Sequence, residues 1–149
     1  MMSGVPSGAL SVPRFSYHLT LPHPPRWVDF WKPVPDYSQR IKQKTRDGYH
    51  YVHEVMDIVQ EFQRNEGAGI IISPCRLEVI FKLPKNQKEG HGICNNLAIV
   101  EHCLETAKLV QSKRCFRECS ASYVAYHEHK HFKTKGRVEV FVESMVVHE

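Results

Sequence analysis

The chain has 149 residues, of which 42% are hydrophobic and 24% charged, a composition typical of one soluble globular domain with a short extension. Twenty Lys and Arg against sixteen Asp and Glu give a net charge of +4, a weaker excess than many dedicated nucleic-acid-binding domains carry. No apolar run approaches the ~20 residues of a membrane span, and the first residues lack the basic and apolar regions of a secretory signal. Five cysteines, none in a CxxC pair, predict reduced thiols and a cytoplasmic protein, with the nucleus as the alternative compartment.

The domain is predicted to begin at the first charged residue. Residues 1–13 are rich in Gly, Ser and Pro and carry no charge, so we expect a flexible tail followed by a single domain at 14–149. Apolar and polar side chains alternate directly after this tail, which predicts a strand with one buried face. The apolar members of this strand are Phe15, Tyr17, Leu19 and Leu21.

Prolines interrupt regular structure over residues 22–35. Proline removes a backbone donor and biases the preceding residue toward extended geometry, so this segment is predicted to be a stiff surface strap. The strap also contains three large aromatic residues, Trp27, Phe30 and Trp31. These rings either pin the strap to its own domain or form a docking surface for a protein partner.

A first helix is predicted after the strap. Asp36 or Ser38 can cap its start, and Gly48 weakens its middle, so its first turns are expected to be separate from the rest. Asn65–Gly69 provides the stop. Apolar residues at helical spacing form its buried stripe: Ile41, Val52, Val55, Met56, Val59 and Phe62.

The middle of the chain alternates between strand and helix patterns. Ile70–Ile72 is a short buried strand or the start of a longer one, and a clearer strand follows at 76–83. A polar, glycine-ended loop at 84–92 separates this strand from a second helix, which Asn95 or Asn96 can cap. The stripe of the second helix comprises Leu97, Val100, Cys103, Leu104, Ala107 and Val110.

Two further strands, at 120–132 and 137–143, end the sequence. A glycine turn separates them, which favours an antiparallel hairpin. The complete order, β-α-β(β)-α-β-β, predicts an α+β fold: a two-layer sandwich with a mainly antiparallel four- to five-stranded sheet and two helices on one face. Strand parity predicts which residues lie on the uncovered face: Arg14, His18, Arg76, Lys82, His127, His129, His131, Arg137 and Phe141, with Glu78, Glu139 and Glu143.

Two cysteine and histidine patterns carry chemistry that the sequence supports weakly. Thiolate and imidazole are zinc ligands, but the spacing of Cys115, Cys119, His127, His129 and His131 departs from that of usual zinc sites, so no metal or other cofactor is predicted. Cys94 lies near a predicted helix start beside His91, an arrangement that a thiol enzyme could use. No family-type context surrounds this pair, and we expect a protein that is not an enzyme.

Basic residues form three clusters along the chain: Arg40, Lys42, Lys44 and Arg46 around the first helix; Lys113, Arg114 and Arg117 after the second; and Lys130, Lys133, Lys135 and Arg137 around the last turn. If the last turn lies near the end of the second helix, these clusters join into one surface that binds phosphates. Aromatic and histidine rings on the open sheet face then add stacking, as in sheet-based RNA binders.

The sequence therefore predicts a non-enzymatic domain that binds RNA or another polyanion. The alternative is a structural or adaptor protein, such as a complex subunit or a viral matrix-type protein, that acts through its Pro/Trp strap or an edge strand. If the last strand is an unpaired edge, a homodimer can form through it.

Overall fold

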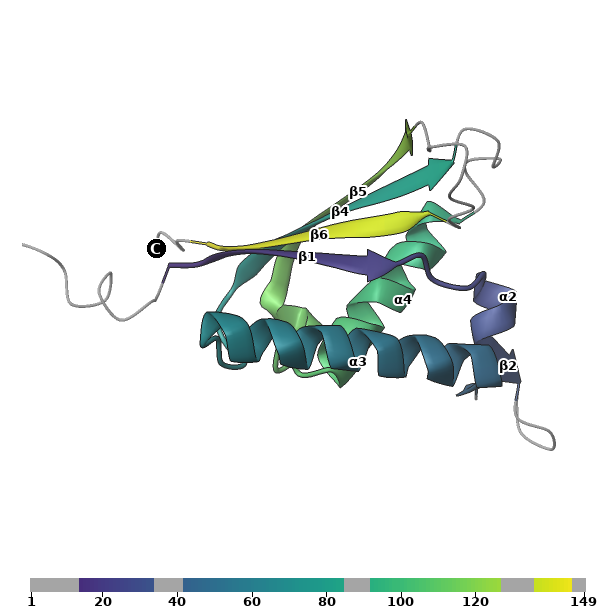
Figure 1. Cartoon of the computed structure of the whole chain (residues 1–149), viewed down its shortest axis with the longest axis horizontal. Coiled ribbons are helices and arrows are strands. Elements are labelled where there is room, and N and C mark those ends of the chain that lie inside the picture. Colours follow the sequence, from purple (N-terminus) through teal and green to yellow (C-terminus); the bar gives the residue numbers. More distant parts are fainter. Residues whose placement is uncertain (1–13, 34–41, 85–91, 127–135, 146–149) are drawn as a thin grey trace, which may run out of the picture.

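The structure, a computed structural model, describes residues 14–33, 42–84, 92–126 and 136–145 (Figure 1). It combines three helices with a four-stranded sheet and a two-stranded ribbon. The strands of the sheet are β1 (Ser16–Pro22), β4 (Cys75–Pro84), β5 (Phe116–Tyr126) and β6 (Arg137–Ser144). The helices are α2 (Trp27–Phe30), α3 (Arg46–Glu66) and α4 (Ile93–Thr106), and the ribbon pairs β2 (Trp31–Pro33) with β3 (Lys42–Lys44). The tail predicted at 1–13 lies outside the described residues.

The sheet has the order β1-β6-β4-β5 and is mixed rather than mainly antiparallel. Strand β6 runs antiparallel to both β1 and β4, whereas β4 and β5 are parallel. The predicted hairpin between the last two strands is wrong because β6 pairs with β1 and β4, and β5 pairs with β4. A helix between two strands returns the chain to the same end of a sheet, and α4 does this between β4 and β5.

The last strand is therefore central, and the edges of the sheet are β1 and β5. The sequence of β6 explains its position, because Val138, Val140 and Val142 are fully buried and form one continuous apolar row. Strand β5 instead has small and polar residues at its centre (Cys119–Ser122), which tolerate an edge position.

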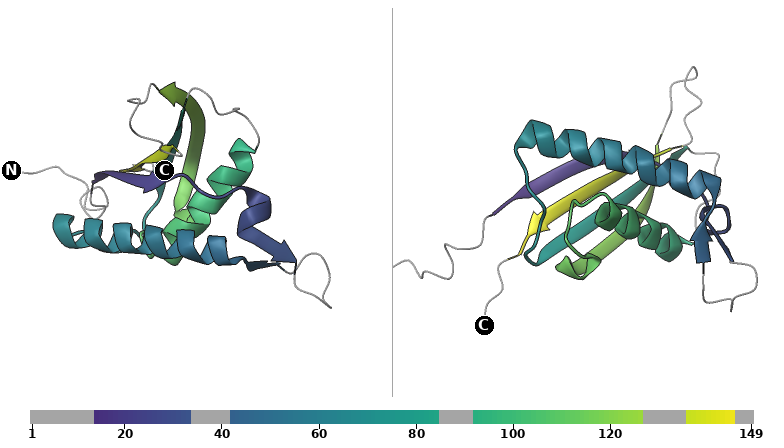
Figure 2. Two further views of the ribbon diagram at one scale, coloured as in Figure 1. Left: turned by 45° about the vertical axis from the view of Figure 1, so that its right-hand side comes forward. Right: turned by 90° about the horizontal axis from the view of Figure 1, so that it is seen from below.

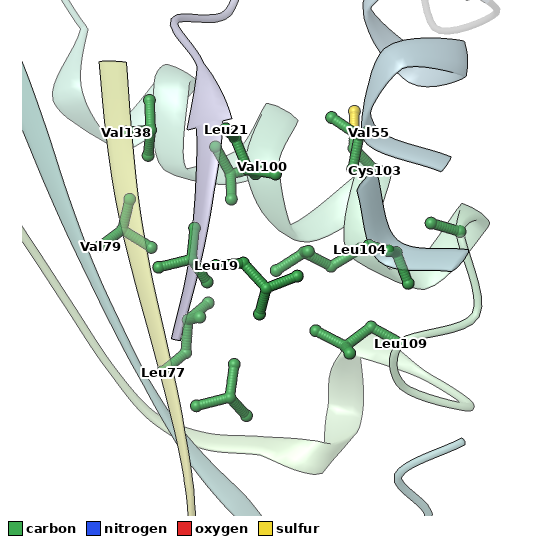
Figure 3. Close-up of a cluster of buried hydrophobic side chains, with 14 of the residues drawn as sticks. Leu19, Leu21, Val55, Leu77, Val79, Val100, Cys103, Leu104, Leu109 and Val138 are labelled. Atoms are coloured by element: carbon green, nitrogen blue, oxygen red, sulfur yellow. The ribbon is translucent and has the colours of Figure 1, made fainter. Parts of the chain in front are cut away.

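Both long helices cover one face of the sheet, so the predicted two-layer arrangement is correct at this level (Figures 1 and 2). The predicted stripe of α3 is buried at Val52, Val55 and Val59. These residues pack with the inward side chains of the strands and with Cys103 and Leu104 of α4 (Figure 3). No helix among the described residues is long and apolar enough to cross a membrane.

Helix α3 begins later than the sequence predicts. Its N-cap is Thr45, whose Oγ1 accepts a hydrogen bond of 3.0 Å from the Gly48 nitrogen. The predicted caps Asp36 and Ser38 lie outside the described residues, and β3 occupies the chain just before Thr45. At the other end, Gly67 ends the helix in the left-handed conformation, within the predicted stop.

Helix α4 and the segment before β4 also differ from the prediction. Gly92 precedes α4, so Asn95 and Asn96 lie in the first turn of the helix rather than at its cap. Asn96 is buried, and its amide donates a hydrogen bond of 2.8 Å to the Tyr123 hydroxyl of β5. In the predicted strand at 70–72, only Ile71 forms a bridge, to Val110.

The strap of residues 22–33 is folded rather than irregular, since it contains α2 and β2. Phe30 is fully buried, and Trp27 and Trp31 are half-buried against the core. The Tyr51 hydroxyl of α3 donates a hydrogen bond of 2.8 Å to the Pro22 carbonyl. These contacts attach the strap to its own domain.

Candidate functional site

The uncovered face of the sheet carries most of the residues predicted there. The strand register places Ser16, Glu143 and Arg76 in one row across β1, β6 and β4. Three further rows follow: His18, Phe141, Glu78 and Ser120; Thr20, Glu139, Ile80 and Ser122; Pro22, Arg137, Lys82 and Val124. The prediction of which side chains lie on the uncovered face is thus correct for β1, β4 and β6.

Parity is reversed for β5. Tyr123, predicted on the uncovered side, packs against the core, with its ring 5.4 Å from that of Phe81. Val124 is 43% exposed. A tyrosine hydroxyl can find a hydrogen-bond partner inside the core or in solvent. The alternation of Tyr123 with Val124 therefore did not show which of the two side chains faces the core. The predicted histidine row, His127, His129 and His131, lies outside the described residues.

The cations of this open face lie beside carboxylates. Arg76 Nε contacts Glu118 Oε2 at 2.7 Å, and Arg137 Nε contacts Glu139 Oε1 at 3.2 Å. Lys82 Nζ lies 4.0 Å from the same Glu139 oxygen. With Glu118, the partner of Arg76, the four rows contain three basic and four acidic residues, and Arg14 precedes the first row, so the described part of this face has no excess of positive charge.

Glu139 is the centre of the open face. Its other oxygen accepts hydrogen bonds from the His18 ring at 2.5 Å and from the Thr20 hydroxyl at 2.8 Å, and the side chain is only 7% exposed. Burial alone raises the pKa of a carboxyl group, but hydrogen bonds from His18 and Thr20, with the charges of His18 and Lys82, lower the pKa of Glu139. The His18 ring also stacks on Phe141, with centroids 4.5 Å apart.

The excess of positive charge lies at another place, which we call the basic corner: residues 26–33 and 42–47, comprising α2, the ribbon and the start of α3 (Figure 1). The basic corner holds five Lys or Arg and two Asp, a net charge of +3. All described residues together hold fourteen basic and twelve acidic side chains, a net charge of +2. The remainder of the described protein is therefore slightly acidic.

Arg26 of the basic corner pairs with Asp29 at 2.8 Å, whereas Lys44 is held by two aromatic rings. Its ammonium group lies 5.5 Å from the centre of the Trp31 ring and 5.6 Å from that of Tyr49. Trp31 and Lys44 are register partners across the ribbon, which explains the first contact. Lys32 and Arg46 are exposed, and Tyr49 is 53% exposed.

The basic corner contacts His102 of α4, and the charge of Lys113, a member of the second predicted cluster, also acts on this histidine. The His102 and Trp31 ring centres are 5.3 Å apart. Burial lowers the pKa of His102, and the charges of Lys44 and Lys113 lower it further, against an opposing effect of Glu105. Neither Trp31 Nε1 nor His102 Nε2, both buried, has a hydrogen-bond partner among the described residues.

Of the third predicted cluster the structure describes only Arg137, which lies apart from the second cluster. Arg114 and Arg117 flank the start of β5, near Cys75 of β4, whereas Arg137 pairs with Lys82 near the opposite end of β4. Seven residues of strand separate these positions, or about 23 Å at roughly 3.3 Å per residue. Arg40, Lys130, Lys133 and Lys135 lie outside the described residues.

The cysteines remain free thiols. Burial raises the pKa of Cys103 to about 12, and burial with the neighbouring Cys115 and Cys119 raises the pKa of Cys75 to about 12. Cys94 is exposed in the first turn of α4, and His91 lies outside the described residues. Among the residues that the structure describes, no three His, Cys, Asp or Glu side chains are placed to hold a metal ion, so Cys115 and Cys119 have no third ligand there.

Sequence reasoning missed Lys32, Tyr49 and His102. Residues 31–33 and 42–44 pair as a two-stranded ribbon. The prolines between these two short segments obscured the ribbon in the sequence. No protein-family model matches this sequence, and no curated protein shows significant similarity to it.

Proposed function

We propose that this chain is a non-enzymatic domain that binds a polyanion, with single-stranded RNA as its expected ligand, and that the basic corner is the contact surface. The charge distribution carries this proposal. The net +3 of the basic corner exceeds the +2 of all described residues, so a polyanion is attracted to this corner and not to the open sheet face. The free cysteines fit a reducing compartment, and we propose the cytoplasm.

The side chains of the basic corner suit the two parts of a nucleotide. Lys32 and Arg46 are exposed and can contact phosphates, and the start of α3 adds the positive end of a helix dipole. Tyr49 offers an exposed ring on which a base can stack. Lys44 is held between Trp31 and Tyr49, which limits the side-chain freedom that binding would cost.

A salt titration with matched charge variants tests the proposal. The full chain is titrated with a fluorescent single-stranded oligonucleotide at several salt concentrations, as wild type, as Lys32→Gln/Arg46→Gln, and as Arg64→Gln/Lys108→Gln. All four residues are exposed, and the last two lie outside the basic corner. We expect the corner variant to bind more weakly, with a log–log salt slope shallower by about 0.7 for each phosphate that the variant no longer neutralises. Equal weakening in both variants, or binding that ignores salt, would refute the proposal.

The free edge of β5 favours a second candidate function, an adaptor that binds proteins by strand addition. Strand β5 has eleven residues, and only one of its edges is paired, with β4, among the described elements. Its centre lacks the charges and prolines that usually protect an edge. Ser120→Lys places a charge there and is expected to abolish dimerisation or partner capture, as measured by sedimentation, while RNA binding persists. If the dimer survives this change, the edge is not the contact.

A further inference from the structure

A cavity of about 500 Å³ lies at the end of the sheet where β1 and β4 begin and β6 ends, away from the basic corner. Small-molecule sites in proteins have volumes of about 300–1,000 Å³. Arg14, Arg76 and Glu143 supply charged side chains to the cavity, and Met145 borders it, whereas the Phe15 ring stacks on Tyr17 on the core side of the sheet.

Backbone hydrogen bonds fix the walls of this cavity. The Phe15 nitrogen donates to Ser144 Oγ at 3.0 Å, and the Ser144 nitrogen donates to the Phe15 carbonyl at 3.0 Å. The Met145 nitrogen donates to the Pro74 carbonyl at 3.2 Å. These bonds fix the backbone around the cavity, from which the exposed side chains of Arg14, Arg76 and Glu143 extend.

The charges around the cavity alternate in sign. Glu143 and Arg76 are opposite each other on β6 and β4, and Arg76 is held on its other side by Glu118. Arg14 is exposed and forms no ion pair within the described part of the chain. The four charges sum to zero, so a ligand with a single net charge is attracted by one group and repelled by another.

We propose that the cavity binds a zwitterionic small molecule of the α-amino-acid class with an apolar side chain. Its carboxylate pairs with the guanidinium groups of Arg14 and Arg76, which match carboxylates in geometry. Its ammonium group pairs with Glu143, and its apolar side chain covers Met145. The cross-strand separation of Arg76 and Glu143, with Cβ atoms about 5 Å apart, suits charges carried on a single carbon atom.

Three related probes separate the parts of this proposal. L-phenylalanine carries both charges, 3-phenylpropionate only the carboxylate, and phenethylamine only the ammonium group. Titration calorimetry or ligand-observed NMR on the full chain is expected to show that L-phenylalanine binds at least about tenfold more tightly than either analogue. Equal binding of 3-phenylpropionate and L-phenylalanine would overturn the zwitterionic assignment.

Charge variants locate the binding. Arg14→Gln and Glu143→Gln alter exposed side chains, so both variants should fold, and each should weaken L-phenylalanine binding about tenfold. Arg64→Gln, in the helix layer on the covered side of the sheet and not among the lining residues, is the control and should bind as the wild type does. Absence of L-phenylalanine binding at millimolar concentration, or binding unchanged in both variants, would overturn the proposal. Either result leaves RNA binding at the basic corner unaffected.

Discussion

The open sheet face and the basic corner contain the same kinds of side chain arranged in opposite ways. On the open face, Arg76 and Arg137 lie against carboxylates, and Glu139 collects four neighbouring donors. In the basic corner, Arg26 pairs with Asp29, but Lys32, Lys44 and Arg46 form no ion pair within the described part of the chain, and Lys44 lies near two aromatic rings. The number of basic residues in a segment therefore does not identify a polyanion surface. Whether a basic segment forms such a surface depends on the acidic residues that the fold places beside it.

The two regions also differ in what holds them. The open face is part of the sheet, and its polar network covers one acid that is itself buried. The basic corner lies beyond the end of the sheet and depends on a few contacts of α2 and the ribbon with α3 and α4 (Figures 1 and 2). Changes to those anchors should have large effects, whereas changes to its exposed cations should alter binding alone.

The largest expected effect is the removal of the main anchor, Phe30. This side chain is fully buried, and replacing it with alanine should lower the free energy of unfolding by about 3–5 kcal/mol. Val28 in the same short helix is 70% exposed, so Val28→Ala should change stability by less than about 0.5 kcal/mol. Chemical denaturation measures both. Similar stabilities of the two variants would mean that the strap is a surface feature that could dock a partner.

A second anchor is the contact between α2 and the first turn of α3. A Cβ atom built on Gly48 would lie 2.5 Å from the Phe30 carbonyl oxygen, whereas one on Gly69 meets nothing within 4 Å. Alanine usually stabilises a helix relative to glycine by about 1 kcal/mol. At Gly48 the clash should reverse the sign and destabilise the protein by about 1–3 kcal/mol. Thermal unfolding of Gly48→Ala and Gly69→Ala checks this, and a stabilised Gly48→Ala protein would contradict the packing of α2 on α3.

On the open face, Glu139→Gln should lower the free energy of unfolding by about 1–3 kcal/mol, because the variant lacks the buried hydrogen bonds to a charged group. The pKa of Glu139 is lowered in the folded protein, so its contribution is present above the ordinary carboxyl pKa and is lost as the pH falls through the folded value. The stability gap between wild type and variant should therefore narrow in acid, below about pH 4.5. Denaturation curves at several pH values test this, with the exposed Glu78→Gln as the control. A gap independent of pH would show that the network adds no charge-dependent stability.

The sequence predicted those parts of the fold that depend on periodicity. The stripes of Val52, Val55 and Val59 and of Val100, Cys103 and Leu104 identified both long helices and the layer that they form. The order of the strands could not be predicted, because an alternating pattern such as that of β6 does not encode which neighbours pair with it. The face of Tyr123 also depended on a partner in another element, Asn96.

For the site, the sequence identified Lys44 and Arg46 as basic but placed both on the first helix, whereas Lys44 ends β3 and only Arg46 lies on α3. It also assigned the phosphate-binding surface to three joined clusters. The approach of Lys44 to His102 joins residues far apart in the chain, as does the contact of Arg76 with Glu118. Such pairs become visible only in the folded structure. The net positive charge of the basic corner likewise depends on which acidic and basic side chains the fold brings together. A count of charges along the sequence does not reveal it.

The smallest expected effect is a change in the pKa of His102. It tests the comparison of the basic corner with the open face most directly, because the charges of the basic corner act on this ring. Burial lowers its pKa first, and Lys44 and Lys113 lower it further, so its neutral form predominates in the folded protein at neutral pH. The stability linked to this group is present above the ordinary histidine pKa of about 6.5 and is lost as the pH falls below it. Lys44→Gln removes one repelling charge and should raise the pKa of His102.

An NMR titration of the histidine rings measures this change, with Arg64→Gln as the control that should leave the His102 pKa unaltered. Bound single-stranded RNA adds negative charge at the same place, so it should raise the pKa of His102 in the wild type and less so in Lys32→Gln/Arg46→Gln. The ring signals of His18 on the open face should not change in chemical shift when RNA binds, because the cations near it lie beside Glu139. An RNA-induced shift at His18 with none at His102 would transfer the binding surface from the basic corner to the sheet.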